Sequence, residues 1–257
     1  MSSVEASVLG AQRRSRRFGI AWRNRVLRSI HDVAVLDADP GVYRFQYCPG
    51  VERVEGFRPF IGFPDFDRVY ESARLWPFFD LRVMDRKRPD YEQYVNWLGL
   101  STEADRLDIL ARNGGEQKGD TVSLVEAPAV DDDGATSATF IVRGSGHAVR
   151  SHGSESTIAG LRHGEALDAR DDVTNEANPA AILLTAAGAP VGWIPDLLIE
   201  YAREVVGSGG SITVLQNNGP SAPWHMRLLV RLAGRVPPGW SAFSGMEWPP
   251  ASASSYR

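Results

Sequence analysis

Apolar and polar residues alternate in two stretches of the first half of the chain. In the stretch from His31 to Tyr47 the alternation is interrupted by "DPG", residues 39–41. The proline fixes φ and the following glycine permits a positive φ, so we expect a β-hairpin there. The second stretch, "DTVSLVEAP" at residues 120–128, predicts the strand that closes this region.

Between these strands the apolar spacing changes to three and four residues, which is typical of helices. One helix is expected after the turn-like Phe63-Pro64-Asp65, with Leu75, Phe78, Phe79 and Val83 near one face. A second is bounded by Pro89 and Gly99, and a third by Thr102 and Gly114, with Asp105 placed for a capping box. Their apolar faces favour a packed core.

The second half begins with "AVDDDGATS", residues 129–137, which is small, acidic and without periodicity and is interpreted as a linker. Strands are then expected within residues 138–146 and 161–172, followed by a hairpin that ends at Trp193. Asp196 and Gly207 bound a helix, and two further strands lie within residues 211–217 and 225–234. Short strands around one helix suggest a compact barrel.

The chain has 257 residues, of which 43% are hydrophobic and 23% charged, and this suits two small globular domains. We therefore predict an α+β protein: a mixed strand and helix domain, then an OB-like β-barrel with one helix. The predicted divisions are a basic arm (1–30), a first domain (31–128), a linker (129–137), a second domain (138–233) and a loosely ordered tail (234–257).

The basic residues are unevenly distributed. The formal net charge of -4 argues against a protein that coats nucleic acid along its whole surface. Seven arginines nevertheless fall between Arg13 and Arg28 without an acidic residue, and this segment is either a solvated arm, a phosphate-contacting arm or a transit peptide. As phosphate contacts, the candidates are Arg13, Arg14, Arg16 and Arg17.

Several classes of site lack support in the sequence. Cys48 is the single cysteine, no apolar run is long enough to span a membrane and no signal core opens the chain, so a reducing, cytoplasmic location without a membrane partner is expected. The glycine clusters at residues 144–146 and 207–210 lack the dinucleotide spacing and read as turns, and His147, His152 and His163 match no zinc pattern. We expect no cofactor, no metal and no catalytic residues, hence a binding or regulatory protein.

A resemblance to a known family arises in the second half. "NEANPAAI" at residues 175–182, followed by "VGWIP" at residues 191–195 and a helix, resembles the HIRAN domain over residues 138–233. The resemblance implies an OB-like barrel that holds the 3′ end of single-stranded DNA by stacking and by hydrogen bonds to the terminal sugar. Ala177 and Asn178 stand where the family has an aromatic-Asp pair. Implied DNA contacts are Asn175, Asn178 and Trp193, unless Trp193 packs as core, with Arg143 and Arg170 as phosphate contacts.

The first half resembles another family. "GVYRFQY", "FRPFIGFPDFD", "LWPFFDLRVM" and "YVNWLGL" follow the order found in the N-terminal subdomain of HipA-type serine/threonine kinases, over residues 31–128. No catalytic-loop aspartate motif follows, so the resemblance implies a part that docks on a kinase rather than phosphoryl transfer. The expected partner surface consists of Trp76, Phe78 and Phe79.

These patterns lead to two main hypotheses. The first is a non-enzymatic regulator that docks on a HipA-type kinase, or on a defence or toxin-antitoxin partner, through its first domain and on DNA through its second. The alternative is a DNA-binding accessory protein that recognises single-stranded 3′ ends or damaged DNA. An enzyme with a site assembled from scattered residues is the third possibility.

Overall fold

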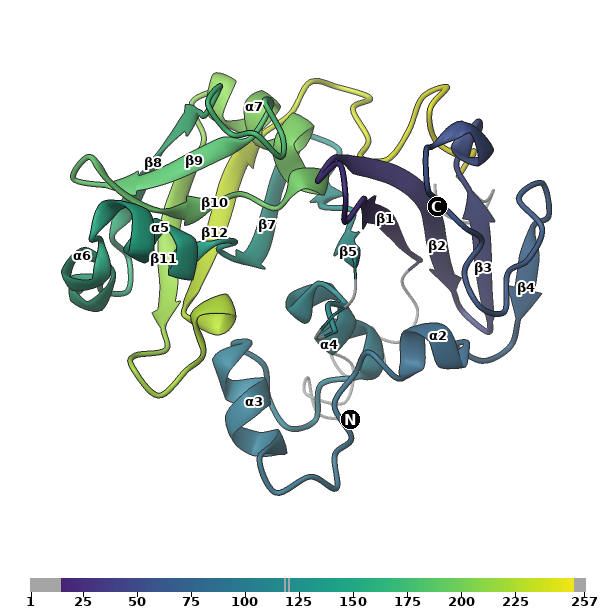
Figure 1. Cartoon of the computed structure of the whole chain (residues 1–257), viewed down its shortest axis with the longest axis horizontal. Coiled ribbons are helices and arrows are strands. Elements are labelled where there is room, and N and C mark those ends of the chain that lie inside the picture. Colours follow the sequence, from purple (N-terminus) through teal and green to yellow (C-terminus); the bar gives the residue numbers. More distant parts are fainter. Residues whose placement is uncertain (1–14, 118, 120, 252–257) are drawn as a thin grey trace.

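The computed structural model describes residues 15–117, 119 and 121–251, and shows a mixed α+β fold with two antiparallel sheets and few helices (Figure 1). The five-stranded sheet has the order β4 (Tyr70–Ser72), β3 (Val42–Tyr47), β2 (Ile30–Asp39), β1 (Arg16–Arg23) and β5 (Val122–Glu126). The seven-stranded sheet has the order β10 (Ala189–Trp193), β9 (Ile182–Ala186), β8 (Ala166–Asp171), β11 (Ser211–Asn217), β12 (Leu228–Arg235), β7 (Ala135–Ile141) and β6 (Ala129–Val130).

The β2–β3 hairpin confirms the expected turn, because Asp39 pairs with Val42 and Gly41 takes a φ of 85°. β1 lies between β2 and β5, and its residues Phe18 and Ile20 are fully buried. A segment interpreted as part of a basic arm is thus an interior strand of the sheet. The apolar run that follows the arginines drives this burial.

The two arginines that open β1 are held by acidic residues inside the protein, which corrects their assignment to nucleic acid. Arg16 donates to both carboxylate oxygens of Glu126, from Nε at 2.7 Å and from Nη2 at 2.8 Å, and also to Asp108. Arg17 is 8% exposed and lies 3.5 Å from Asp37. A desolvated arginine requires such partners. Arg13 and Arg14 lie outside the described residues.

Three helices of the first half lie between β4 and β5 in the sequence. α3 (Tyr91–Trp97) and α4 (Arg106–Asn113) confirm two of the expected helices, whereas α2 covers only Pro77–Asp80. The capping box of α4 joins Asp105 and Asp108, so Asp105 is the N-cap rather than the third residue of the box. Gly114 ends α4 in the left-handed conformation, as expected.

The aromatic segment forms the core of the first half and not an exposed surface. Phe45 and Phe63 have ring centroids 4.0 Å apart, and Phe79 is fully buried against both. The assignment of Phe79 to a partner surface is therefore wrong, since a ring without exposed area contacts only its own core. Trp76 and Phe78 are half-buried and pack edge-on against Phe63.

Residues 129–137 are not a linker, because they form the β6–β7 hairpin. Asp131 Oδ1 accepts hydrogen bonds from the backbone N–H of Asp133 and of Ala135, at 3.1 and 2.7 Å. The acidic run is thus the turn of a hairpin whose longer strand, β7, pairs with β12. An aspartate that accepts from backbone N–H groups two and four residues later is typical of turns.

The second half contains three α-helices where one was expected. α7 (Ile199–Gly207), preceded by the 3-10 helix η2 (Asp196–Leu198), is the predicted one. α5 (Ser145–His152) begins within the glycine cluster that was interpreted as a turn, where Gly144 takes a φ of 66° and redirects the chain, and α6 (Glu155–Gly160) lies in a stretch for which no element was predicted. A further 3-10 helix, η3 (Trp224–Met226), precedes β12, and η1 (Val51–Arg53) follows β3.

The C-terminal segment after β12, within the described residues, covers the top of both sheets, where it is drawn in yellow in Figure 1. Phe243 and Trp248 are buried with ring centroids 5.0 Å apart. Phe243 lies directly over Gly19 of β1, where no Cβ fits. The expectation of a loose tail is wrong, since its aromatic residues supply hydrophobic burial that periodicity does not reveal.

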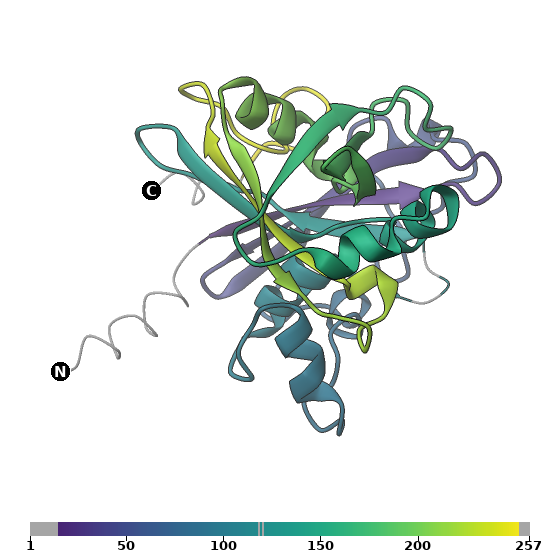
Figure 2. The same ribbon diagram turned by 90° about the vertical axis from the view of Figure 1, so that its left-hand side faces the viewer.

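The two halves share their cores. Ala21, Val35 and Val125 of the five-stranded sheet, and Cys48 directly after β3, belong to the core of the second half, and Ile141, Met226 and Leu229 belong to that of the first. Figure 2 shows α3, in blue, below the turn between β11 and β12. Gln216, near the end of β11, and Asn218, in that turn, donate to the carbonyls of Asn96 and Trp97, both at 2.8 Å. Within the described ranges, none of the helices is long and apolar enough to cross a membrane.

A substitution pair tests the aromatic core. Replacing fully buried Phe63 by alanine is expected to lower the free energy of unfolding by about 3–5 kcal/mol, through lost transfer energy and the cavity left behind. Ile61, two residues away and 91% exposed, provides the control, and its alanine variant is expected to change stability by less than about 0.5 kcal/mol. Urea unfolding measures both, and equal losses would contradict the assignment of the core.

Candidate functional site

A cavity lies between the loop that joins β1 to β2, the start of α5 and the segments on either side of the β9–β10 hairpin. It has a volume of about 610 Å³. Four residues predicted to contact nucleic acid border it: Arg143, Asn175, Asn178 and Trp193. They come from the segment between β7 and α5, from β10 and from the loop before β9, so folding brings together what the sequence separates.

Trp193 is held in one orientation. Its indole Nε1 donates to Asp172 Oδ2 at 2.9 Å, and the ring of His147 lies with its centroid 5.6 Å away. Burial raises the pKa of Asp172, but hydrogen bonds from Thr174, Trp193 and Asn175 outweigh it and hold that pKa below its usual value. Trp193 is half-buried, so its ring borders the cavity instead of lying wholly in the core.

The backbone around Trp193 explains the glycine of "VGWIP". Arg143 and Trp193 exchange two backbone hydrogen bonds of 2.8 Å, which join the end of β7 to the end of β10. Gly192 takes a φ of 142°, and a Cβ on it would lie 2.4 Å from the carbonyl oxygen of Arg143. A Cβ on Gly144 would lie 2.7 Å from the Trp193 ring. Only glycine allows these two approaches.

Asn175 and Asn178 shape the loop beside the cavity. Asn175 Oδ1 accepts from the backbone N–H of Ala177 and of Asn178, both at 3.1 Å. Asn178 Oδ1 accepts from Ala180, and its Nδ2 donates to Asp196 at 2.7 Å. The two side chains therefore hold the wall of the cavity, and their oxygens are already occupied by the protein.

Two arginine side chains on the opposite wall bring positive charge to the cavity. Arg23, at the end of β1, and Arg28, in the following loop, are exposed and border the cavity. Neither has an ion-pair partner within the described part of the chain. Arg143 differs, because its Nη1 lies 2.8 Å from Glu116. Two arginines with free donors beside a cavity are suited to bind phosphate groups.

The remaining predicted residues lie elsewhere. Arg170 is exposed on β8 and does not border the cavity. Arg16 and Arg17 lie inside the five-stranded sheet, and Trp76 and Phe78 pack on the aromatic core of the first half. The prediction thus separates into four residues at one cavity, residues that pack or pair within the first half, and Arg170, which is exposed elsewhere.

Sequence analysis missed other residues that border the cavity, namely Arg23, Arg28, His147, His152, Asp172 and Asp196. The arginines were visible as part of the basic segment, but no signal in the sequence separated them from Arg16 and Arg17, because the strand β1 was not predicted. The histidines gave no such signal, since α5, which carries both, was not foreseen.

The arrangement combines a fixed aromatic ring, free guanidinium groups and carboxylates in a cavity large enough for a nucleotide. The carboxylates of Asp172 and Asp196 accept hydrogen bonds and are suited to a sugar hydroxyl or a base amino group.

In the residues that the structure describes, no group of three His, Cys, Asp or Glu side chains is placed to hold a metal. Burial raises the pKa of the Cys48 thiol to about 12, so it is protonated at neutral pH.

Comparison with known proteins adds no relative: the chain matches no protein-family model, no curated protein and no solved structure.

The close approach at Gly192 gives a testable expectation. Gly192→Ala is expected to lower the free energy of unfolding by about 3 kcal/mol or more, because a Cβ there meets a backbone oxygen. Gly188, in the β9–β10 turn, also has a positive φ of 81° but has open space around it. Gly188→Ala should therefore cost only about 1–2 kcal/mol of backbone strain. Chemical denaturation compares the two, and a smaller loss at Gly192 would contradict the packing described.

Proposed function

We propose that this protein binds single-stranded DNA and that the cavity beside Trp193 receives a strand terminus. The observation that carries the proposal is the convergence on one cavity of an oriented indole and the guanidinium groups of Arg23 and Arg28, which have no ion-pair partner among the described residues. Base stacking on an aromatic side chain contributes about 1–3 kcal/mol, and arginines supply the salt-dependent attraction to phosphate.

A closed cavity wall favours an end over a continuous strand. The loop held by Asn175 and Asn178 closes one side, and α5 with His147 and His152 closes another. Asp172 and Asp196 offer carboxylate oxygens to a terminal sugar hydroxyl, which hydrogen-bonds to a carboxylate as a donor. A terminal phosphate in the same place would meet these carboxylates with like charge, so a free hydroxyl end is the proposed ligand.

The second half is further proposed to be a HIRAN-like unit of OB type. Its support is the sequence order of residues 175–195 before α7, together with the position of the same residues at one cavity. Asn178 donates to Asp196 instead of presenting a carboxylate of its own, so the acidic function is assigned to Asp172 and Asp196.

The test is fluorescence anisotropy with labelled single-stranded DNA that carries either a 3′ hydroxyl or a 3′ phosphate, with duplex DNA as a third ligand. We expect tighter binding of the free 3′ hydroxyl. Trp193→Ala should weaken that binding by about 5- to 150-fold through lost stacking, and Trp193→Phe, which keeps a ring, by less. Circular dichroism checks that both variants fold. Equal affinity for the two ends would contradict the proposed terminus.

The contribution of Arg23 and Arg28 can be measured separately, through the salt dependence of DNA binding. Each phosphate contact on a single strand contributes about 0.7 to the slope of log K against log salt concentration, so the double variant Arg23→Gln, Arg28→Gln should reduce the slope by about 1.4. Arg170→Gln removes an exposed arginine away from the cavity and should leave the slope unchanged. A double variant with the slope of the unmodified protein would remove both arginines from the site.

A further inference from the structure

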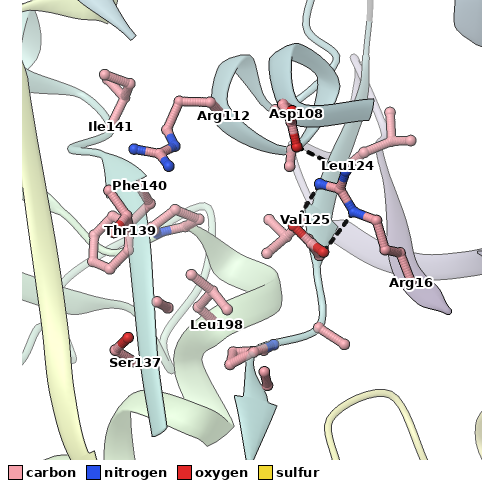
Figure 3. Close-up of a pocket in the computed structure, with 18 of the residues that line it drawn as sticks. Arg16, Asp108, Arg112, Leu124, Val125, Ser137, Thr139, Phe140, Ile141 and Leu198 are labelled. Atoms are coloured by element: carbon pink, nitrogen blue, oxygen red, sulfur yellow. Dashed lines mark hydrogen bonds and ion pairs between the residues drawn. The ribbon is translucent and has the colours of Figure 1, made fainter. Parts of the chain in front are cut away.

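A second cavity, of about 240 Å³, lies between the two halves of the protein. Its walls come from α4 and β5 of the first half and from β7 and η2 of the second (Figure 3). None of the hypotheses drawn from the sequence uses it. The side chain that distinguishes it is Arg112, on the last turn of α4.

Arg112 extends into this cavity without an anionic partner. Figure 3 shows its guanidinium directed from α4 toward Phe140 and Ile141 of β7, away from Asp108. Its only hydrogen bond in the described structure is a long one, from Nη1 to the carbonyl of Leu98 at 3.4 Å, and none of the described carboxylates lies within 4.0 Å. Burial lowers the pKa of Arg112, which marks the cost of desolvating this charge.

The nearest acidic residues are already occupied. Asp108 Oδ1 accepts from Arg16 Nη1 at 2.9 Å, and both oxygens of Glu126 accept from the same guanidinium at 2.7 and 2.8 Å. Arg16 thereby uses the two carboxylates that border the cavity, and Figure 3 shows Asp108 directed toward Arg16 and not toward Arg112. The donors of Arg112 remain available to a ligand.

The opposite wall supplies hydroxyl groups, and an arginine on the neighbouring strand β12, outside the cavity lining, contacts one of them. Ser137 and Thr139 alternate along β7, so both side chains lie on the face that α4 covers, and both border the cavity. Arg231 is the register partner of Thr139 on β12, and its Nη2 donates to Ser137 Oγ at 3.2 Å. Arg231 has no ion pair with the residues that the structure describes.

We propose that this cavity binds a small oxyanion, namely phosphate or a phosphate monoester, with Arg112 as the principal ligand and the hydroxyls of Ser137 and Thr139 as further donors. The planar guanidinium presents paired N–H donors that match two oxygens of a phosphate group. The ligand compensates a charge that the protein itself leaves unpaired. This site is independent of the proposed DNA terminus, whose ring and arginines line a different cavity.

The experiment measures thermal unfolding and calorimetric binding with inorganic phosphate, against chloride at equal ionic strength. It uses the full chain carrying Arg23→Gln and Arg28→Gln, so that the other cavity does not compete. At about ten times Kd, phosphate is expected to raise Tm by about 3–6 °C. Arg112→Gln should weaken binding by about 10- to 100-fold and abolish that rise. Arg150→Gln, which removes an exposed arginine of α5, should leave both unchanged.

Two further arms make the result unambiguous. Arg112→Lys keeps the charge but not the paired donors, and binding between that of the unmodified protein and that of Arg112→Gln would support the assigned geometry. A nucleoside monophosphate in place of inorganic phosphate distinguishes an ester from the free ion, and Arg112-dependent binding of either supports the site. An equal rise of Tm in Arg112→Gln, or no rise with either ligand, would overturn the proposal.

Discussion

The structure depends on the junction of Arg143 and Trp193, whose backbones exchange two hydrogen bonds. Three glycines make room for it: a Cβ would lie 2.0 Å from Arg143 Nη2 at Gly114, 2.4 Å from the Arg143 oxygen at Gly192, and 2.7 Å from the Trp193 ring at Gly144. Gly114 also ends α4, so one position serves both a helix terminus and the contact between the halves. The junction fixes the indole, closes the end of the seven-stranded sheet and borders both cavities.

The contact between the halves is a continuation of their cores. Val125 belongs to the core of the second half and Leu229 to that of the first, while Phe243 of the C-terminal segment covers β1. Removing apolar surface from water at such a contact stabilises both halves together. The consequence for function is direct, because each cavity takes one wall from each half and retains its shape only while the halves are joined.

Local structure was predictable where a local interaction determines it. The β2–β3 hairpin follows from Pro40 and Gly41, and α4 ends at Gly114 because a left-handed residue ends a helix. The arm, the linker and the tail were mispredicted for a common reason: their order comes from distant partners, such as Glu126 for Arg16 and Gly19 for Phe243. Three residues of the candidate site, Asn175, Asn178 and Trp193, followed from the order of a short motif, whereas His147 and Arg28 join it only through the tertiary fold.

The arginines show most clearly why the residues of a binding site cannot all be predicted from the sequence. Arg16 and Arg112 are the same residue type, and both border the cavity between α4 and β7. Arg16 takes the carboxylates of Asp108 and Glu126, and this leaves Arg112 without an acidic partner among the described residues. The structural arginine and the ligand-binding arginine therefore differ only in which of them is paired with the acidic residues in the folded protein. The capacity to bind an anion here is a property of the whole charge arrangement, since moving either acid would exchange the two roles.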